Sequence, residues 1–194
     1  MQIILVRHGR PEHSAASWCT PAQMKGWLER YNEADVAGHE VPDRLVSLAR
    51  AAGAVVCSSV ARCVQSRAFL DVDCCLQPDP LFAEAHLPYL DWPFPRLPPS
   101  LWRLLFRSAW FCGFARHTEP IGESNQRAGA AAERLIQLAE GHGSVLLMGH
   151  GIMNILIARQ LRKRGWAGPL HLLMRSYWHA SVYRKGSPSA HAGG

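Results

Sequence analysis

The chain has 194 residues, 48% hydrophobic and 19% charged, which is an ordinary composition for a single folded globular domain. Its formal net charge is +6, but the arginines are scattered and no nucleic-acid-binding motif accompanies them. We therefore expect an anionic small molecule as partner and exclude nucleic acid.

The cysteines, at positions 19, 57, 63, 74, 75 and 112, form no C-x-x-C pair and no zinc-like spacing with histidine. The first residues resemble a strand and not a secretory signal peptide. These features predict free thiols and a cytoplasmic location.

The first predicted element is a buried strand, because residues 3–6 read IILV, a bulky apolar run with no turn signal. The run stops at Arg7 and His8, and α/β sheets bind ligands just beyond the carboxyl ends of their strands. Arginine binds phosphate in a bidentate fork and histidine can act as a nucleophile. The pair indicates phosphoryl chemistry, although a surface arginine beside a surface histidine would give the same letters.

Residues 12–28 are polar and turn-rich, and they predict a loop over this crevice. Lys25 and Gly26 could offer an anion a cation and a backbone N–H group. A solvated lysine is the alternative interpretation.

A helix is predicted over residues 41–52 with Gly53 as its C-terminal stop, followed by a buried strand over residues 54–57. The next helix is expected to begin at once, capped by the serines at 58 and 59. Arg62 then lies in its first turn, where it can reach the crevice beside free helix N–H groups. An exposed arginine behind an ordinary cap is the alternative.

Residues 74–77 suggest a short strand, and residues 81–86 place Glu84 at a further strand end. Residues 87–120 break the α/β pattern, first with prolines and then with an apolar, aromatic helix that starts at Ser100. The apolar face expected on this helix consists of Leu101, Trp102, Leu105 and Trp110.

The helix at residues 100–114 is too short and too charged to span a membrane. Packing within the chain or in a homodimer, a lid over the site, and a membrane-surface contact all remain open for it.

The rest of the chain predicts a helix over residues 123–140 closed by Gly141, and a third buried strand over residues 144–148. His150 follows that strand between two glycines, and we expect these to leave room for a ligand. A helix over residues 152–164 and a last strand over residues 178–183 complete the pattern. Residues 185–194 are expected to form a flexible tail.

Together these segments resemble the histidine phosphatase superfamily, in its phosphoglycerate-mutase-like branch. The resemblance covers residues 2–183 except 87–120, and it rests on LVRHG at 5–9, SSVAR at 58–62 with SRA at 66–68, GES at 122–124 and GHG at 149–151. It implies a three-layer α/β/α sandwich with a mostly parallel central sheet. The whole would be one domain, residues 1–184, with residues 87–120 as an insert.

The resemblance also implies a metal-independent phosphatase, without cofactor, that acts on a small phosphorylated metabolite. His8 would carry the phosphoryl group while Arg7, Arg62 and His150 hold its oxygens, and Glu84 would protonate the leaving oxygen. Further substrate contacts are expected from Ser14, which replaces the usual asparagine, and from Lys25, Gly26 and Gly151.

Physical reasoning agrees with these roles. Nearby arginines disfavour a charged imidazole, so His8 should stay neutral, and they supply the charge that a metal would otherwise bring. Burial against residues 81–83 should raise the pKa of Glu84 while nearby Arg7 and Arg62 should lower it, and a working acid needs burial to have the larger effect. Glu123, at a helix start, should stay ionised.

Two other functions remain open. A phosphoglycerate mutase-type phosphotransferase is less favoured, because the mutases carry a Gly-Leu-x-Gly-x-x-Lys-like segment after the acid and this chain has HLPYLD at residues 86–91. A catalytically weak binding or membrane-associated module is the second. Substrate identity would depend on residues 11–40 and on the insert.

Overall fold

A mixed sheet forms the centre of the protein. The computed structural model describes residues 1–13, 18–37, 41–170 and 176–185, and within them the strand order is β2-β3-β1-β5-β4. Three strands run parallel: β1 (Gln2–Arg7), β2 (Ala54–Cys57) and β3 (Ser144–Gly149). The antiparallel β5 (Ala180–Lys185) pairs with β1, and the short β4 (Trp166–Ala167) pairs with β5 at the edge.

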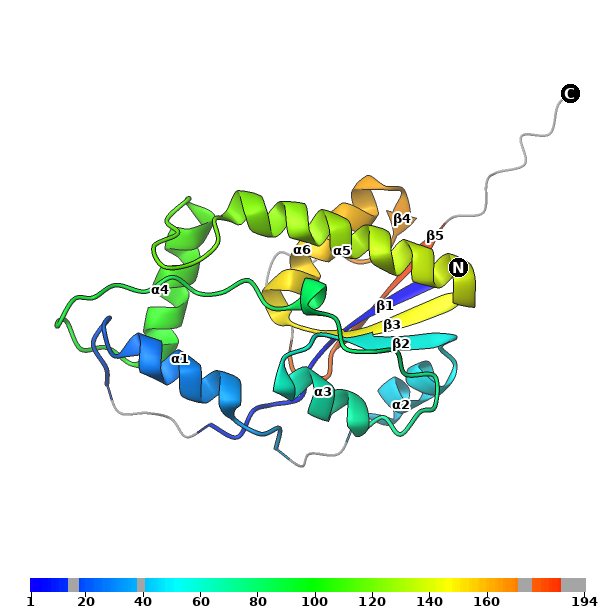
Figure 1. The fold of residues 1–194 in the computed structure, drawn as a ribbon, viewed down its shortest axis with the longest axis horizontal. Coiled ribbons are helices and arrows are strands. Elements are labelled where there is room, and N and C mark those ends of the chain that lie inside the picture. Colours follow the sequence, from blue (N-terminus) through cyan, green and yellow to red (C-terminus); the bar gives the residue numbers. More distant parts are fainter. Residues whose placement is uncertain (14–17, 38–40, 171–175, 186–194) are drawn as a thin grey trace, which may run out of the picture.

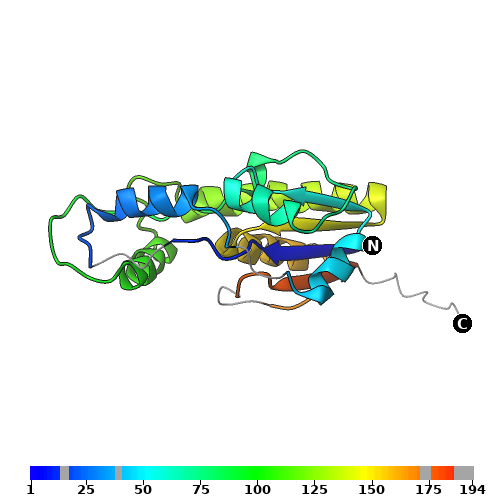
Figure 2. The ribbon, with the colours of Figure 1, turned by 90° about the horizontal axis from the view of Figure 1, so that it is seen from below.

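Helices cover both faces of the sheet, which gives the expected three-layer α/β/α sandwich (Figures 1 and 2). One face is covered by α5 (Ile121–His142) and α6 (Gly151–Lys163), and the other by α2 (Asp43–Arg50) and α3 (Ala61–Ala68). Successive residues of β1 alternate between the two cores because strand side chains alternate between faces. This two-sided burial explains the uninterrupted apolar runs of the parallel strands.

Two helices lie beyond the carboxyl ends of the parallel strands, namely α1 (Met24–Glu33) and α4 (Pro99–Phe111) (Figure 1). Trp27 of α1 packs with Trp102 and Phe106 of α4 in a third, smaller core. The indole N–H of Trp102 donates to the carbonyl oxygen of Cys19 at 2.8 Å. The helices α1 and α4 therefore pack on each other beside the carboxyl ends of the parallel strands.

The face of α4 differs from the prediction. Trp102 and Trp110 are 6% and 0% exposed, whereas Leu101 and Leu105 are 38% and 44% exposed. Residues spaced by four lie on one side of a helix, so positions 102, 106 and 110 face inward together and 101 and 105 do not join them. The helix also begins at Pro99, with Pro98 and not Ser100 at the cap.

Several predicted boundaries are also wrong. Residues 74–77 make only an isolated bridge from Cys75 to Val55, and a 3-10 turn, η1 (Pro80–Phe82), precedes Glu84 where a strand end was expected. The predicted loop over residues 12–28 contains the start of α1. The last strand begins at residue 180 because Trp178 has a φ of 61°, outside extended backbone.

Some expectations concern features outside these elements. Ser14 and residues 186–194 of the predicted tail lie outside the described residues. Within the described part of the chain, no helix combines the length and hydropathy needed to cross a membrane.

Neither glycine that was predicted to stop a helix does so. The helix α2 ends at Arg50, before Gly53, and α5 continues through Gly141 to His142, with Gly143 as its cap at a φ of 76°. Gly53 is required for another reason: a Cβ atom there would lie 2.0 Å from the carbonyl oxygen of His142.

We predict opposite effects on stability for alanine at these two glycines. Gly53→Ala should lower the free energy of unfolding by about 1–3 kcal/mol, because the backbone at His142 cannot yield easily. Gly141→Ala should raise it by about 0.5–1 kcal/mol, since its Cβ would meet nothing within 4 Å and alanine favours helix. Urea unfolding of both variants tests this, and equal stability of Gly53→Ala and the wild type would contradict it.

Candidate active site

The carboxyl ends of the parallel strands bring three of the predicted side chains into direct contact. His8 follows β1, Arg62 lies in the first turn of α3, and His150 caps α6 directly after β3. Arg62 Nε donates to His8 Nε2 at 3.1 Å, and Arg62 Nη2 lies 3.2 Å from His150 Nδ1. All three are nearly inaccessible, with exposures of 2%, 3% and 0%. The structure thus places one guanidinium between two imidazoles.

The tautomer of His8 follows from its neighbours. Its Nδ1 lies 2.7 Å from the carbonyl oxygen of Gly9, which can only accept, so Nδ1 carries the proton. Nε2 then keeps a lone pair, which accepts from Arg62. Burial, followed by His150 and Arg62, holds the pKa of His8 well below 6.5. The ring is therefore neutral at pH 7, as expected from the sequence.

Arg62 is positioned by partners on all of its nitrogens. The third, Nη1, donates to Asn32 Oδ1 at 2.9 Å. Ser66 Oγ donates to the Arg62 carbonyl oxygen and accepts from the Gly9 N–H group, which ties α3 to the loop after β1. Sequence reasoning missed Asn32 because it predicted no helix over residues 24–33; the helical spacing of residues 25, 28, 29 and 32, which all line one cavity, was the available signal.

Two tyrosines that were not predicted lie against the site arginines. The guanidinium carbon of Arg7 lies 4.1 Å from the Tyr177 ring centroid, and that of Arg62 lies 5.5 Å from the Tyr31 ring centroid. The two hydroxyl groups are 3.3 Å apart. Burial and this contact raise the pKa of Tyr31 to about 12. Tyr31 therefore remains a neutral ring, and the two aromatic rings restrict both guanidinium planes.

His150 is more enclosed than its flanking glycines suggested. Its Nδ1 accepts from Arg62, so Nε2 carries the proton, and Nε2 lies 2.9 Å from Ser58 Oγ. Burial and then Arg62 hold its pKa well below 6.5. Ser58 therefore contacts His150 and does not cap α3, whose cap residue is Val60 with no side-chain hydrogen bond.

Gly149 is needed for close packing. A Cβ atom on it would lie 2.5 Å from Oδ1 of Asn154, whose Nδ2 donates to the carbonyl oxygen of Val6 at 2.9 Å. The first glycine of GHG thus makes room for a side chain that ties α6 to β1 at the site.

Glu84 reaches the site from a loop and not from a strand end. Its Oε1 accepts from the Met153 N–H group at 2.9 Å and its Oε2 from the Ile152 N–H group at 3.2 Å. The expected apolar wall is therefore replaced by the amino end of α6, the kind of environment that was predicted for Glu123. Glu123 itself lies exposed in the first turn of α5.

Arg127 fixes the loop that carries Glu84. Its guanidinium donates to the carbonyl oxygens of Ala83 at 2.6 Å and of Glu84 at 3.4 Å, and it pairs with Glu119. The loop backbone is thus anchored to α5 while the Glu84 carboxylate lies at the cavity.

A cavity of about 910 Å³ opens from this cluster toward α1 and α4. Its lining includes Arg7, His8, Arg62, Glu84 and Lys25. The Lys25 side chain is 60% exposed and lies 4.0 Å from Glu29. Lys25 and Gly26 belong to a helix and not to a loop, and of the two only Lys25 lines the cavity.

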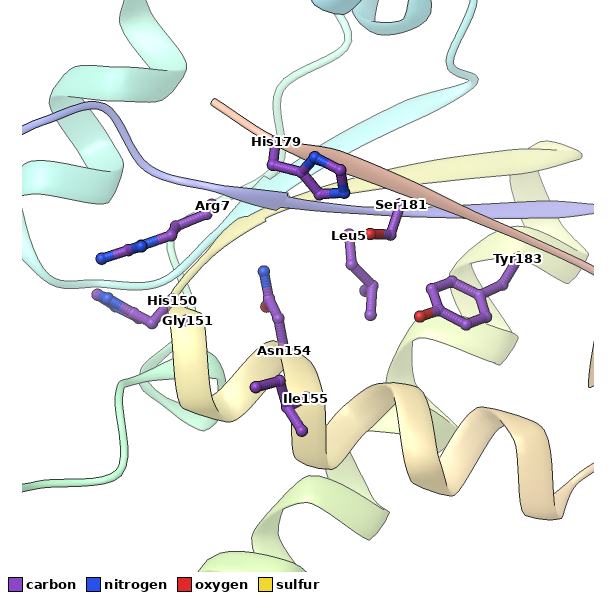
Figure 3. A pocket seen from close by; sticks show the side chains of 9 residues that line it. All are labelled: Leu5, Arg7, His150, Gly151, Asn154, Ile155, His179, Ser181 and Tyr183. Atoms are coloured by element: carbon purple, nitrogen blue, oxygen red, sulfur yellow. The ribbon is translucent and has the colours of Figure 1, made fainter. Parts of the chain in front are cut away.

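A smaller cavity of about 20 Å³ lies behind the cluster, between β1, β5 and α6. Figure 3 shows Arg7 and His150 at one end of it and Tyr183 at the other, with Asn154 between them. Gly151 lines this cavity and not the larger one. The smaller cavity has room for at most one water molecule and is too small for a substrate.

The arginines are the main cations at the larger cavity, and the described residues contain no group of three His, Cys, Asp or Glu side chains placed to hold a metal ion. The lining of the larger cavity includes a neutral imidazole, several guanidinium groups and two carboxylates, those of Glu29 and Glu84.

The buried neutral histidines predict a loss of stability in acid. The folded-state pKa values of His8 and His150 lie below that of an unfolded histidine, about 6.5. Below pH 6.5 the unfolded chain therefore binds protons that the folded chain does not. The free energy of unfolding should fall there by up to about 1.4 kcal/mol per pH unit for each histidine.

Denaturant unfolding between pH 5 and pH 8 measures this slope. The double variant His8→Asn, His150→Asn should show a shallower slope, and His142→Asn, at an exposed position, should keep that of the wild type. An unchanged slope in the double variant would show that these imidazoles do not cause the acid sensitivity.

Comparisons with known proteins agree on the fold. No family model and no curated protein matches the sequence. The structure resembles a mycobacterial glucosyl-3-phosphoglycerate phosphatase in complex with VO3, with a TM-score of 0.59 and 17% identity over 93% of this chain and 91% of that one. It also resembles the ecdysone phosphate phosphatase of Bombix mori in complex with tungstate, with a TM-score of 0.56 and 16% identity over 96% and 92%.

A third similar structure is YhfR of Bacillus stearothermophilus, with a TM-score of 0.56 and 18% identity over 84% of this chain and 80% of that one. All three are histidine phosphatase superfamily structures. The chain therefore has the fold of the histidine phosphatase superfamily, the one that its sequence motifs resemble.

Proposed function

We propose that this protein is a phosphatase that hydrolyses a small-molecule phosphomonoester through a phosphohistidine intermediate on His8. One observation carries the proposal: the unprotonated Nε2 of a neutral, buried His8 faces the Arg62 guanidinium at the wall of a large cavity. A nucleophile beside a phosphate-binding cation is what phosphoryl transfer requires. The phosphatases among the similar structures support the same reaction class.

In the first step, His8 Nε2 attacks phosphorus and the bond from phosphorus to the ester oxygen breaks. Arg62 now donates to Nε2, so this hydrogen bond must be released; phosphoryl oxygens are better acceptors for a guanidinium than an imidazole is. Arg7 and Arg62 then stabilise the charge on the transferring group. His150 orients Arg62 from the opposite side.

Proton transfer is assigned to Glu84. As a carboxylic acid it gives its proton to the leaving ester oxygen. In the second step its carboxylate takes a proton from water, which attacks phosphorus and breaks the bond to Nε2, so inorganic phosphate leaves and His8 is restored. For this cycle Glu84 must give up at least one hydrogen bond from the amino end of α6.

We expect a covalent phosphoenzyme on His8. A brief incubation with radiolabelled acetyl phosphate should label the wild type with an acid-labile, base-stable group, and peptide mapping should place it on His8. The variant His8→Asn should take up no label. The matched control is His86→Asn. His86 also lines the cavity, but Arg62 forms its hydrogen bonds with other residues. Full labelling of His8→Asn would refute the proposal.

We predict that Glu84→Gln discriminates between leaving groups. Turnover of an alkyl phosphate, whose leaving oxygen needs a proton, should fall by about 10²–10⁴-fold. With p-nitrophenyl phosphate, whose leaving group needs little protonation, the pre-steady-state burst of p-nitrophenol should survive while steady-state turnover slows. Glu123→Gln serves as the control. An equal loss of burst and alkyl turnover in Glu84→Gln, or a selective loss in Glu123→Gln, would contradict the assignment.

A further inference from the structure

The cavity extends well beyond the groups that phosphoryl transfer needs. Its volume of about 910 Å³ lies near the upper end of the range for ligand pockets, roughly 300–1,000 Å³. Successive turns of α4 line the side of the cavity opposite His8. The lining residues of α4 are Ser100, Arg103, Leu104, Arg107, Ser108 and Phe111. A phosphoryl group at Arg7 and Arg62 would leave this side free for the rest of a substrate.

One nitrogen of Arg107, in the wall of the cavity, donates no hydrogen bond to any described residue. Its Nη2 donates to the carbonyl oxygen of Ala85 at 2.8 Å, which fixes the guanidinium. Its Nη1 is buried and has no hydrogen-bond partner among the described residues. Burial lowers the pKa of Arg107, the Glu84 carboxylate raises it, and Arg103 lowers it again, with a net lowering. A buried charged donor left unpaired is costly, so an acceptor in addition to the described residues, such as an anionic ligand, would stabilise this atom.

Arg103 lies one turn before Arg107 on the same side of α4. Its guanidinium carbon lies 5.3 Å from the Tyr31 ring centroid and 5.8 Å from that of Trp27, and these two rings are stacked on each other. No carboxylate of the described residues lies within ion-pair distance of it. Two like charges at this spacing repel each other, and a bound anion would offset the repulsion.

The carboxylates at the cavity are already engaged. Glu84 accepts two N–H groups of α6, and Glu29 lies beside Lys25. A transferred phosphoryl group would neutralise the charge at Arg7 and Arg62 but not that on α4. The cavity lining also has an apolar part, which includes Leu28, Leu87, Ile152 and Ile155.

We infer that Arg103 and Arg107 form a second anion-binding subsite, so that the substrate is a phosphomonoester with an apolar or aromatic body and a second acidic group, a carboxylate or a phosphate. This inference rests on the proposed phosphatase activity and specifies its substrate class.

Matched substrates test the subsite. Phenyl phosphate is compared with 4-carboxyphenyl phosphate and with 1,4-phenylene bisphosphate, and hexyl phosphate is compared with 6-phosphonooxyhexanoate. These pairs vary the chemical group of the second anion and its distance from the first phosphate. The wild type should favour at least one acidic member over its neutral partner by about 10–100-fold in kcat/KM, as expected for charge-assisted hydrogen bonds. The acidic substrate with the highest kcat/KM shows whether the subsite binds a carboxylate or a phosphate.

The double variant Arg103→Met, Arg107→Met should bring this ratio close to one. Arg103→Lys, Arg107→Lys keeps the charge and should retain a preference, which guards against a variant that merely fails to fold. Arg116→Met is the control, because Arg116 belongs to the same insert but is half-exposed and paired with Asp91. Equal turnover of acidic and neutral partners by the wild type, or a preference that persists in the Met variant, would overturn the inference.

A binding measurement separates this inference from the proposed reaction. In calorimetric titrations of His8→Asn, 4-carboxyphenyl phosphate should bind about 10–100-fold more tightly than phenyl phosphate. If the wild type hydrolyses no phosphomonoester but this difference is found, the subsite stands and the phosphatase assignment fails. If hydrolysis is found without the difference in affinity or turnover, the subsite fails alone.

Discussion

The site depends on one buried cation held by two neutral imidazoles. Burying a guanidinium is costly unless its donors are paired, and Arg62 meets this requirement through His8, His150 and Asn32. Burial, together with this charge, lowers the pKa of both rings and keeps them neutral. The arrangement that makes the arginine tolerable in the core therefore also keeps on His8 Nε2 a lone pair that becomes available when the hydrogen bond from Arg62 is released, which is the property that a nucleophile at neutral pH needs.

The surrounding structure keeps these groups in register. Three parallel strands end at the same edge of the sheet. The residues directly after β1 and β3 therefore meet the first turn of α3 there, without long loops. Ser66 and Asn154 connect α3 and α6 to the segment around β1 by hydrogen bonds. Tyr31 and Tyr177 restrict the guanidinium planes from the side of the cavity. Positioning thus comes mostly from short polar contacts and stacked rings at the strand ends.

The two ends of the cavity have different origins. The end that carries His8 and Arg62 is built on the sheet, where the strands fix the relative positions of these side chains. The opposite end is built from α1 and α4, which pack on each other in a small core of their own. Substrate preference would accordingly depend on α4 and its arginines, and changes there need not disturb the groups that carry out the reaction.

The amino-acid sequence alone determined the three parallel strands and the residues at their ends. Residues 3–6, 54–57 and 144–148 are apolar runs that only a strand buried on both faces suits, and parallel strands must bring His8, Arg62 and His150 to one edge. These features depend on neighbouring residues and on a general rule of sheet topology, so they were predictable.

Only the tertiary structure decided the contacts between distant segments. Asn32 reaches Arg62, Tyr31 meets Tyr177, and Glu84 accepts from the amino end of α6 across separations of 30 to 146 residues. The inward side of α4 was likewise fixed by the core available to Trp102 and not by its own pattern. No local propensity encodes such partners, because each depends on where the rest of the chain has already been placed.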